Sequence, residues 1–160
     1  MNKHKIKETL KKKGRKHIGN RAVITTRDKK IGVYLHWNGG RDSVQGFLTY
    51  CKLQNFRSPE YDNYGWARLC QVCANFFNDG LCIGIDEYEE LDYDNGDNGV
   101  YIIENWEIVG REYFEYSQEQ DSYDLYEVLV AIDESQPEDI QMAKNTNNKI
   151  EFFKSLVSKE

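Results

Sequence analysis

The sequence lacks any run of eighteen apolar residues, and no apolar stretch follows its basic N-terminus. A membrane-spanning helix needs about 20 consecutive apolar residues, and a secretory signal needs an apolar segment behind its positive charges. Because both features are missing, we expect neither a membrane span nor secretion. The protein is therefore predicted to be cytoplasmic.

Cysteine is scarce, with four in 160 residues, which is too few for a disulfide scaffold. Cys70 and Cys73 have the spacing of zinc ligands, and Cys51, Cys82 or His36 could complete a site. The pair lies within a predicted helix, however, at positions where apolar residues would serve equally well. We expect free, buried thiols, no metal and no other cofactor.

A complete calcium loop is also missing. Counting from Asp92 puts Asp97 at the sixth position, where the loop requires glycine, and Ile103 at the twelfth, where it requires a bidentate Glu. Counting from Asp94 leaves Asn105 at the twelfth position. We therefore predict an acidic loop in solvent.

No catalytic arrangement can be assigned. The turn 36–41 lies between a predicted strand and a predicted helix, where backbone N–H groups and Arg41 could bind an anion, but it has neither glycine pattern of a phosphate-binding loop. His36 is the single histidine of the predicted folded domain, and no carboxylate can be placed beside it for nucleophilic catalysis. We expect a stoichiometric binding protein rather than an enzyme.

Charge is divided into two blocks of opposite sign. Residues 1–30 hold twelve Lys and Arg against Glu8 and Asp28, and the remainder holds nine basic and twenty-five acidic residues. The blocks carry about +10 and −16, which add to the net −6. Between residues 86 and 138 there are eighteen Asp and Glu and one base, Arg111. Such a block repels nucleic acid and attracts proteins that bind it.

We predict that the segment 86–126 forms an acidic, tyrosine-rich surface for a basic protein partner, with aromatic residues as anchors. A solvated acidic face is the alternative. Eight aromatic residues are interleaved with the acids: Tyr88, Tyr93, Tyr101, Trp106, Tyr113, Tyr116, Tyr123 and Tyr126. The predicted contact residues are Asp86, Glu87, Glu89, Glu90, Asp92, Tyr93, Asp94 and Asp97.

The basic N-terminal segment, residues 1–18, is predicted to be a flexible arm because its few apolar residues cannot offset the entropy of ordering it. It could contact phosphates, remain a solvated tail, or be attracted by the acidic body. The candidate nucleic-acid contacts are Lys11, Lys12, Lys13, Arg15 and Lys16.

Residues 19–160 are predicted to form a single α+β domain. Its sheet should be antiparallel or mixed, with four to five strands and with helices packed on one face. Alternating and helical apolar patterns predict the order ββααβββαα. The expected strands are 21–27, 31–37, 81–85, 100–104 and 106–110, and the expected helices are 42–56, 64–78, 122–134 and one near 150–157. Asp42 or Ser43 should cap the first helix.

Several strings resemble small proteins carried by phages and mobile elements of bacteria. They are Gly19-Asn-Arg-Ala-Val-Ile-Thr, Tyr34-Leu-His-Trp-Asn-Gly-Gly-Arg, Gly65-Trp-Ala-Arg-Leu-Cys-Gln-Val, and Asp94-Asn-Gly-Asp-Asn-Gly-Val-Tyr-Ile-Ile with Trp106-Glu-Ile-Val. The resemblance spans about residues 19–134 and assigns no functional residues.

Small acidic proteins of such elements often act against host defence. The resemblance and the charge together imply an anti-CRISPR protein that binds and blocks a type II RNA-guided nuclease in the bacterial cytoplasm. Such nucleases hold nucleic acid in positively charged channels, which an acidic surface could occupy. The alternatives are inhibition of a restriction enzyme and a nucleic-acid-associated role of the basic arm in the element itself.

Deletion of residues 1–18 should leave the melting temperature nearly unchanged, because too few apolar groups are present there for the arm to stabilise the domain. Calorimetry of the full chain and of the shortened chain measures this. A loss of several degrees would show that the arm docks on the body.

Overall fold

The structure is a computed structural model, and it describes residues 20–78, 82–114, 117, 119–120 and 122–159. The predictions for the arm 1–18, including Lys11, Lys12, Lys13, Arg15 and Lys16, lie outside the described residues.

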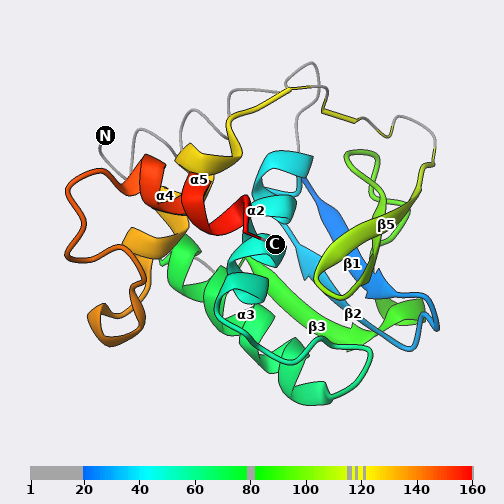
Figure 1. Cartoon of the computed structure of the whole chain (residues 1–160). Coiled ribbons are helices and arrows are strands. Elements are labelled where there is room, and N and C mark those ends of the chain that lie inside the picture. Colours follow the sequence, from blue (N-terminus) through cyan, green and yellow to red (C-terminus); the bar gives the residue numbers. More distant parts are fainter. Residues whose placement is uncertain (1–19, 79–81, 115–116, 118, 121, 160) are drawn as a thin grey trace.

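One mixed sheet of five strands forms the centre of the fold, in the order β3-β2-β1-β4-β5 (Figure 1). The strands are β1 (Ala22–Thr26), β2 (Ile31–Leu35), β3 (Ile83–Glu87), β4 (Val100–Glu104) and β5 (Glu107–Glu112). Neighbouring strands are antiparallel, except that β1 and β4 are parallel. The predicted α+β class is therefore confirmed.

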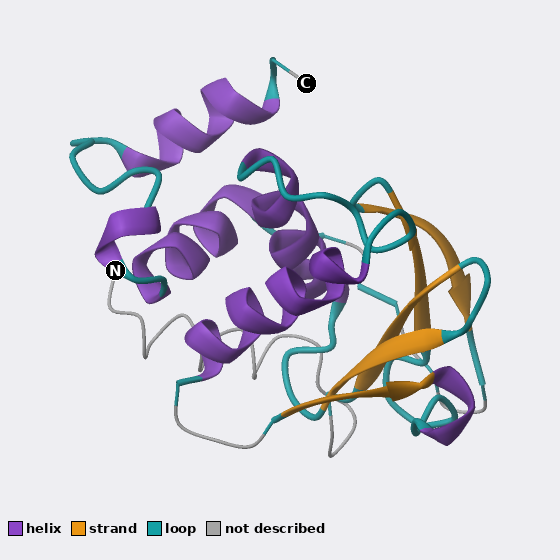
Figure 2. Ribbon diagram, turned by 90° about the horizontal axis from the view of Figure 1, so that it is seen from below, coloured by secondary structure: helices purple, strands orange, loops and turns teal. Residues whose placement is uncertain are grey.

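The described residues form four α-helices, all on one side of this sheet (Figure 2). They are α2 (Arg41–Leu53), α3 (Asn63–Phe77), α4 (Leu125–Ser135) and α5 (Lys149–Val157), with short 3₁₀ turns η1 (Tyr88–Glu90) and η2 (Glu138–Ile140). Helices α2 and α3 lie against the strands, α4 packs on α2 and α3, and α5 packs on α4. Asp62, Asp124 and Asn148 cap α3, α4 and α5 through their side chains. The predicted order ββααβββαα is confirmed.

Some boundaries differ from the predictions. Helix α2 begins at Arg41 and ends at Leu53, and its N-cap is Gly40, which makes no side-chain cap bond. The capping prediction was wrong because the Asp42 carboxylate instead accepts the N–H of Ser43, at 2.7 Å. Strand β3 extends to Glu87, two residues beyond the predicted end, because its pairing with β2 continues to Ile31.

The hairpin between β4 and β5 turns at Asn105 and Trp106, both with positive φ, of 51° and 64°. A left-handed backbone is uncommon for a bulky residue such as Trp. Here the Trp106 side chain is 4% exposed, and its indole Nε1 donates to the Phe56 carbonyl at 2.8 Å. Burial of this ring joins the hairpin to the end of α2.

Two apolar clusters lie on opposite faces of the sheet. The larger lies under the helices, where the rings of Phe47, Phe76 and Phe77 meet edge to face. The smaller joins Val23 and Val100 of the sheet to Tyr88, with the partly buried residues Tyr34, Leu91, Tyr93, Ile102 and Phe114. This second cluster was not predicted, and it is covered by the chain between β3 and β4.

A fully buried carboxylate joins the helices. Asp133 of α4 accepts the hydroxyl of Tyr50 at 2.7 Å and the backbone N–H groups of Met142 and Ala143 at 2.7 and 3.0 Å. Burial and the bond to Asp133 raise the pKa of Tyr50. The carboxylate therefore satisfies three donors, two of them buried, that α2 and the chain after η2 present.

Replacing Asp133 by Ala should lower the free energy of unfolding by about 3–5 kcal/mol, because three donors, two of them buried, lose their acceptor. Asp133→Asn should lose less, since the amide oxygen still accepts. Urea denaturation measures both changes, and Asp139→Ala, at an exposed position of η2, is the control. Equal stability of Asp133→Ala and the control would contradict a bonded core carboxylate.

Candidate protein-binding surface

Four carboxylates project from the C-terminal end of β3 and from η1. Asp86, Glu87, Glu89 and Glu90 are exposed, and no described ion pair includes any of them. We call these four residues the edge carboxylates. Asp92, Glu104, Glu107, Glu112 and Glu119, by contrast, each lie within 4 Å of a Lys or Arg nitrogen. The edge carboxylates are therefore four neighbouring acids that have no ion-pair partner among the described residues.

Tyr88 holds the edge carboxylates in place. Its backbone N–H donates to the Lys30 carbonyl at 2.9 Å, and its side chain is 6% exposed. Its ring stacks on Tyr93, with centroids 5.1 Å apart. Burial raises the pKa of Tyr88 to about 12, and the charge of Glu112 adds to the effect. Because this ring points inward, the acids on either side of it in sequence remain in solvent.

The other acids of the predicted site have different environments. Asp94 is exposed, and Asp92 is exposed but lies 3.5 Å from the Arg21 guanidinium. Tyr93 is half-buried between Tyr88 and Phe114. It therefore packs within the second apolar cluster and does not project as a free aromatic anchor.

Asp97 does not belong to the exposed surface, and its assignment as a contact residue is corrected. It is 3% exposed, and its Oδ2 accepts both the backbone N–H and the Nε of Arg21, at 3.0 and 2.7 Å. The hydrogen bond to Asp97 raises the pKa of Arg21. The nearby amide of Asn95 bonds the Asp97 and Gly99 N–H groups. The sequence alone could not show that Asp97 is buried while Asp94 is exposed, because the burial of Asp97 depends on its contact with the distant Arg21.

The loop contains two Asn-Gly steps, a pairing that suits positive φ, and φ is +73° at Gly96 and +65° at Gly99. At Gly99 a Cβ would lie 2.3 Å from the Glu112 carbonyl oxygen. The tight loop that carries Asp97 therefore requires glycine at this position.

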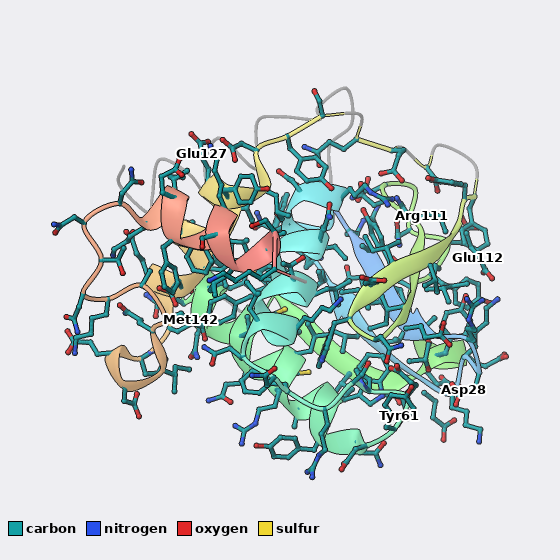
Figure 3. The ribbon with its side chains drawn as sticks, viewed as in Figure 1. Asp28, Tyr61, Arg111, Glu112, Glu127 and Met142 are labelled. Atoms are coloured by element: carbon teal, nitrogen blue, oxygen red, sulfur yellow. The ribbon has the colours of Figure 1, made fainter. Side chains whose placement is uncertain are left out.

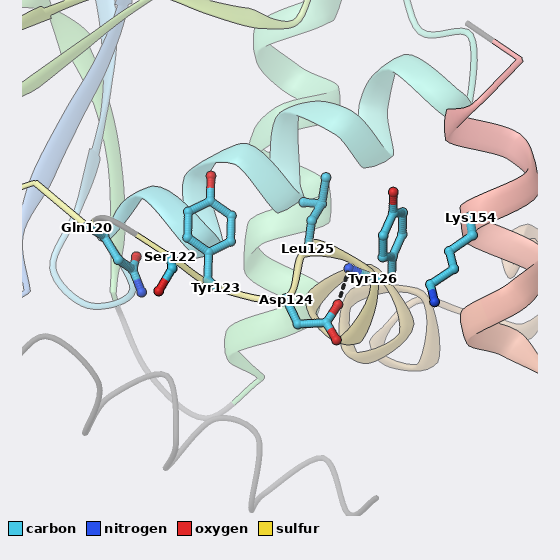
Figure 4. Close-up of a pocket in the computed structure, with 7 residues that line it drawn as sticks. All are labelled: Gln120, Ser122, Tyr123, Asp124, Leu125, Tyr126 and Lys154. Carbon is cyan, nitrogen blue, oxygen red and sulfur yellow. Dashed lines mark hydrogen bonds between the residues drawn. The ribbon is translucent and has the colours of Figure 1, made fainter.

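The tertiary structure separates the later part of the acidic block from the edge carboxylates. Tyr123, Tyr126 and Asp124 line a hollow of about 880 Å³ beside α4, together with Gln120, Ser122, Leu125 and Lys154 (Figure 4). Asp124 accepts the N–H groups of Tyr126 and Glu127 as a helix cap. In Figure 1, α4 lies on the left of the molecule and the end of β3 lies on the right. The segment 86–126 is thus not one continuous surface.

The remaining aromatic residues of the block also serve mainly to stabilise the fold. Tyr101 is fully buried and donates to the Gly39 carbonyl at 2.7 Å, and the Arg111 guanidinium lies 3.6 Å from the centre of its ring. Tyr113 is 50% exposed, and its hydroxyl donates to Glu119 at 2.8 Å. Tyr116 lies outside the described residues. The candidate surface is therefore acidic but not rich in exposed tyrosine.

Sequence reasoning missed a group of tyrosines and arginines at the start of α3. Tyr61 is 75% exposed and projects at the edge of the molecule (Figure 3). The guanidinium carbons of Arg57 and Arg68 lie 4.8 and 4.3 Å from the centre of the Tyr64 ring. Tyr and Arg are enriched at protein interfaces. The signal was present in the sequence, because Arg57 and Tyr61 precede the predicted helix 64–78 and Tyr64 and Arg68 lie in its first turns.

The groups considered for catalysis are dispersed. The His36 ring bonds the Tyr34 hydroxyl through Nδ1 at 2.8 Å, and no described hydrogen bond joins the ring to a serine, cysteine or carboxylate. Arg41 pairs with Glu119 at 3.0 Å. Within the described part of the chain, no three His, Cys, Asp or Glu side chains are grouped as metal ligands.

The four cysteines are free, with Cys51 and Cys73 fully buried and Cys70 and Cys82 half-buried. Burial raises the pKa of the thiols of Cys51, Cys70 and Cys73, which keeps them protonated and unreactive. Two of the four thiols predicted to be buried, Cys51 and Cys73, are therefore fully enclosed in the apolar cluster under the helices.

No described helix has both the length and the apolar character needed to cross a membrane. The chain matches no known family model, and no curated protein or solved structure is detectably similar to it. The resemblance to phage and mobile-element proteins stays a prediction.

Asp97→Ala should lower the free energy of unfolding by about 1–2 kcal/mol, because the buried Arg21 N–H loses its acceptor. Asp94→Ala, three residues away and exposed, should change it by less than about 0.5 kcal/mol. Thermal and urea denaturation of the two variants tests the assignment. Equal stability of the two variants would contradict the assignment of Asp97 as a buried residue that stabilises the fold.

Proposed function

We propose that this protein is a binding protein that blocks a host-defence nuclease. It would do so by occupying the positively charged surface with which the nuclease binds nucleic acid. The observation that supports this is the exposure of the four edge carboxylates, for which the described residues provide no cation. A partner with Lys and Arg on its surface can supply the missing positive charges.

The physical basis is replacement of phosphates by carboxylates. A nuclease binds nucleic acid with Lys and Arg side chains, and a cluster of carboxylates can attract the same side chains. Long-range attraction between the acidic protein and a basic channel accelerates association. The rigid anchor at Tyr88 keeps the four charges together, so less conformational entropy is lost when the partner binds.

The target we propose is a type II RNA-guided nuclease in the bacterial cytoplasm. Such a nuclease has positively charged channels for its heteroduplex and reads a short duplex motif through Arg or Lys. The acidic net charge and the resemblance to phage proteins support this choice. A restriction enzyme offers a similar basic surface, and it is the alternative target.

Neutralising the edge carboxylates should reduce inhibition at least about tenfold, since four charge-assisted contacts are lost. The variant is Asp86→Asn, Glu87→Gln, Glu89→Gln and Glu90→Gln. Its matched control is Glu127→Gln, Glu138→Gln, Asp139→Asn and Glu151→Gln, which changes the net charge equally on the helical side; Glu127 lies far from β3 in Figure 3. Titration against purified, guide-loaded nuclease in a cleavage assay measures the loss.

The unaltered protein should need about one copy per nuclease and should co-elute with it on size exclusion. Full inhibition by the folded edge variant would remove this surface from the mechanism. The protein could also have no effect on type II nucleases and bind a restriction enzyme instead. That result would support the proposal that it is a nuclease inhibitor and would reject the type II nuclease as its target.

A further inference from the structure

Strand β3 is the last strand of the sheet on its side, so one of its edges has no neighbouring strand among the described residues. At its two ends, His36 N–H donates to the Cys82 carbonyl and Tyr88 N–H donates to the Lys30 carbonyl. Antiparallel ladders alternate between residues that bond the partner and residues that face away. Even-numbered residues therefore bond β2, and Ile83, Ile85 and Glu87 direct their backbone N–H and C=O groups outward.

The side chain at the centre of this open edge is apolar and exposed. Ile85 is 52% exposed, although its cross-strand neighbour Val33 is fully buried. An exposed apolar residue between outward-facing backbone groups is a template for another strand. Such an edge would pair with unrelated strands and cause aggregation unless charged side chains repel them.

The edge carboxylates determine which partners are excluded. Asp86 and Glu87 belong to β3 itself, and Glu89 and Glu90 follow in η1. A second copy of this chain, with its net charge of −6, would bring the same acids to the edge and be repelled. A segment rich in Lys and Arg would instead be attracted. The charges thus close the edge to acidic strands and leave it open to basic ones.

We propose that the outer edge of β3 binds an extended, Lys- and Arg-rich segment of the partner protein as a sixth strand of the sheet. The backbone groups of Ile83, Ile85 and Glu87 form the ladder, Ile85 packs against an apolar side chain of the segment, and the edge carboxylates bind its cations. This inference rests on the proposed function, because it states how the same surface holds its basic partner.

The first test uses hydrogen exchange with a synthetic peptide as the probe. A short peptide of alternating Lys and Val should slow amide exchange at Ile83, Ile85 and Glu87 at least tenfold, while Gly84 and Asp86, already bonded to β2, change little. The control peptide has the same sequence with consecutive N-methylated residues, which keeps every charge but cannot form a ladder. Protection by both peptides alike, or no protection at the three odd positions, would overturn strand addition.

The second test uses a variant of the edge itself. Ile85→Pro removes an N–H that points away from β2, so the sheet keeps its own ladder, and edge strands tolerate proline at such a position. This variant should bind the Lys/Val peptide at least tenfold more weakly in fluorescence anisotropy. Ile85→Thr, which keeps the N–H and the β-branch, should lose only a few-fold. Equal loss in the two variants would show that the side chain, and not the ladder, binds the peptide.

The outcomes separate this inference from the function on which it rests. If neutralising the edge carboxylates abolishes nuclease inhibition and Ile85→Pro leaves it unchanged, the inhibitor proposal stands and strand addition is overturned. If the peptide protects the three odd amides while no nuclease is inhibited, strand addition stands and the nuclease target is rejected. Melting curves confirm that each variant is folded.

Discussion

The parallel pairing of β1 with β4 is the contact on which the rest of the fold depends. It joins the first strand of the domain to a strand that follows α2, α3 and β3 in sequence, with Val23 opposite Val100 and Thr26 opposite Ile103. The loop before β4 extends the pairing, because Arg21 bonds Asp97 and the Asn98 side chain bonds the Arg21 carbonyl. Without these bonds the two halves of the sheet would be joined only by the helical layer and by the second apolar cluster.

This pairing also decides the route of the acidic segment. Strand β3 lies at one edge of the sheet and β4 lies beyond β1, so the chain between them must cross β2 and β1. The helices cover one face, and the segment crosses the other, where Tyr88, Leu91 and Tyr93 pack against the sheet. Its apolar residues are used in this crossing, and the acids that begin it remain at the edge. The candidate surface is therefore a consequence of the sheet order.

The same geometry gives the acidic residues three different roles. Asp133 and Asp97 are buried and satisfy backbone donors, and Asp62 and Asp124 cap helices. The edge carboxylates have no such role: among the described contacts only Asp86 accepts a hydrogen bond, from the adjacent N–H of Glu87. Since acids that stabilise the fold are held by donors of the chain itself, those without donors are the ones available to a partner. The edge carboxylates are four neighbouring members of the block of eighteen acids, and all four are exposed.

The sequence by itself determined the elements and their order. Local patterns sufficed for this, because β-branched runs such as 22–26 and the apolar spacing of α2 and α3 act over a few residues. Glycine in the two Asn-Gly steps likewise indicated positive φ from local sterics alone. Only the tertiary structure decided that Asp97 is buried, that Tyr88 and Tyr101 point inward, and that β3 is an edge strand. Those properties depend on contacts between residues far apart in sequence, such as Arg21 with Asp97 at a separation of 76, and no local pattern records them.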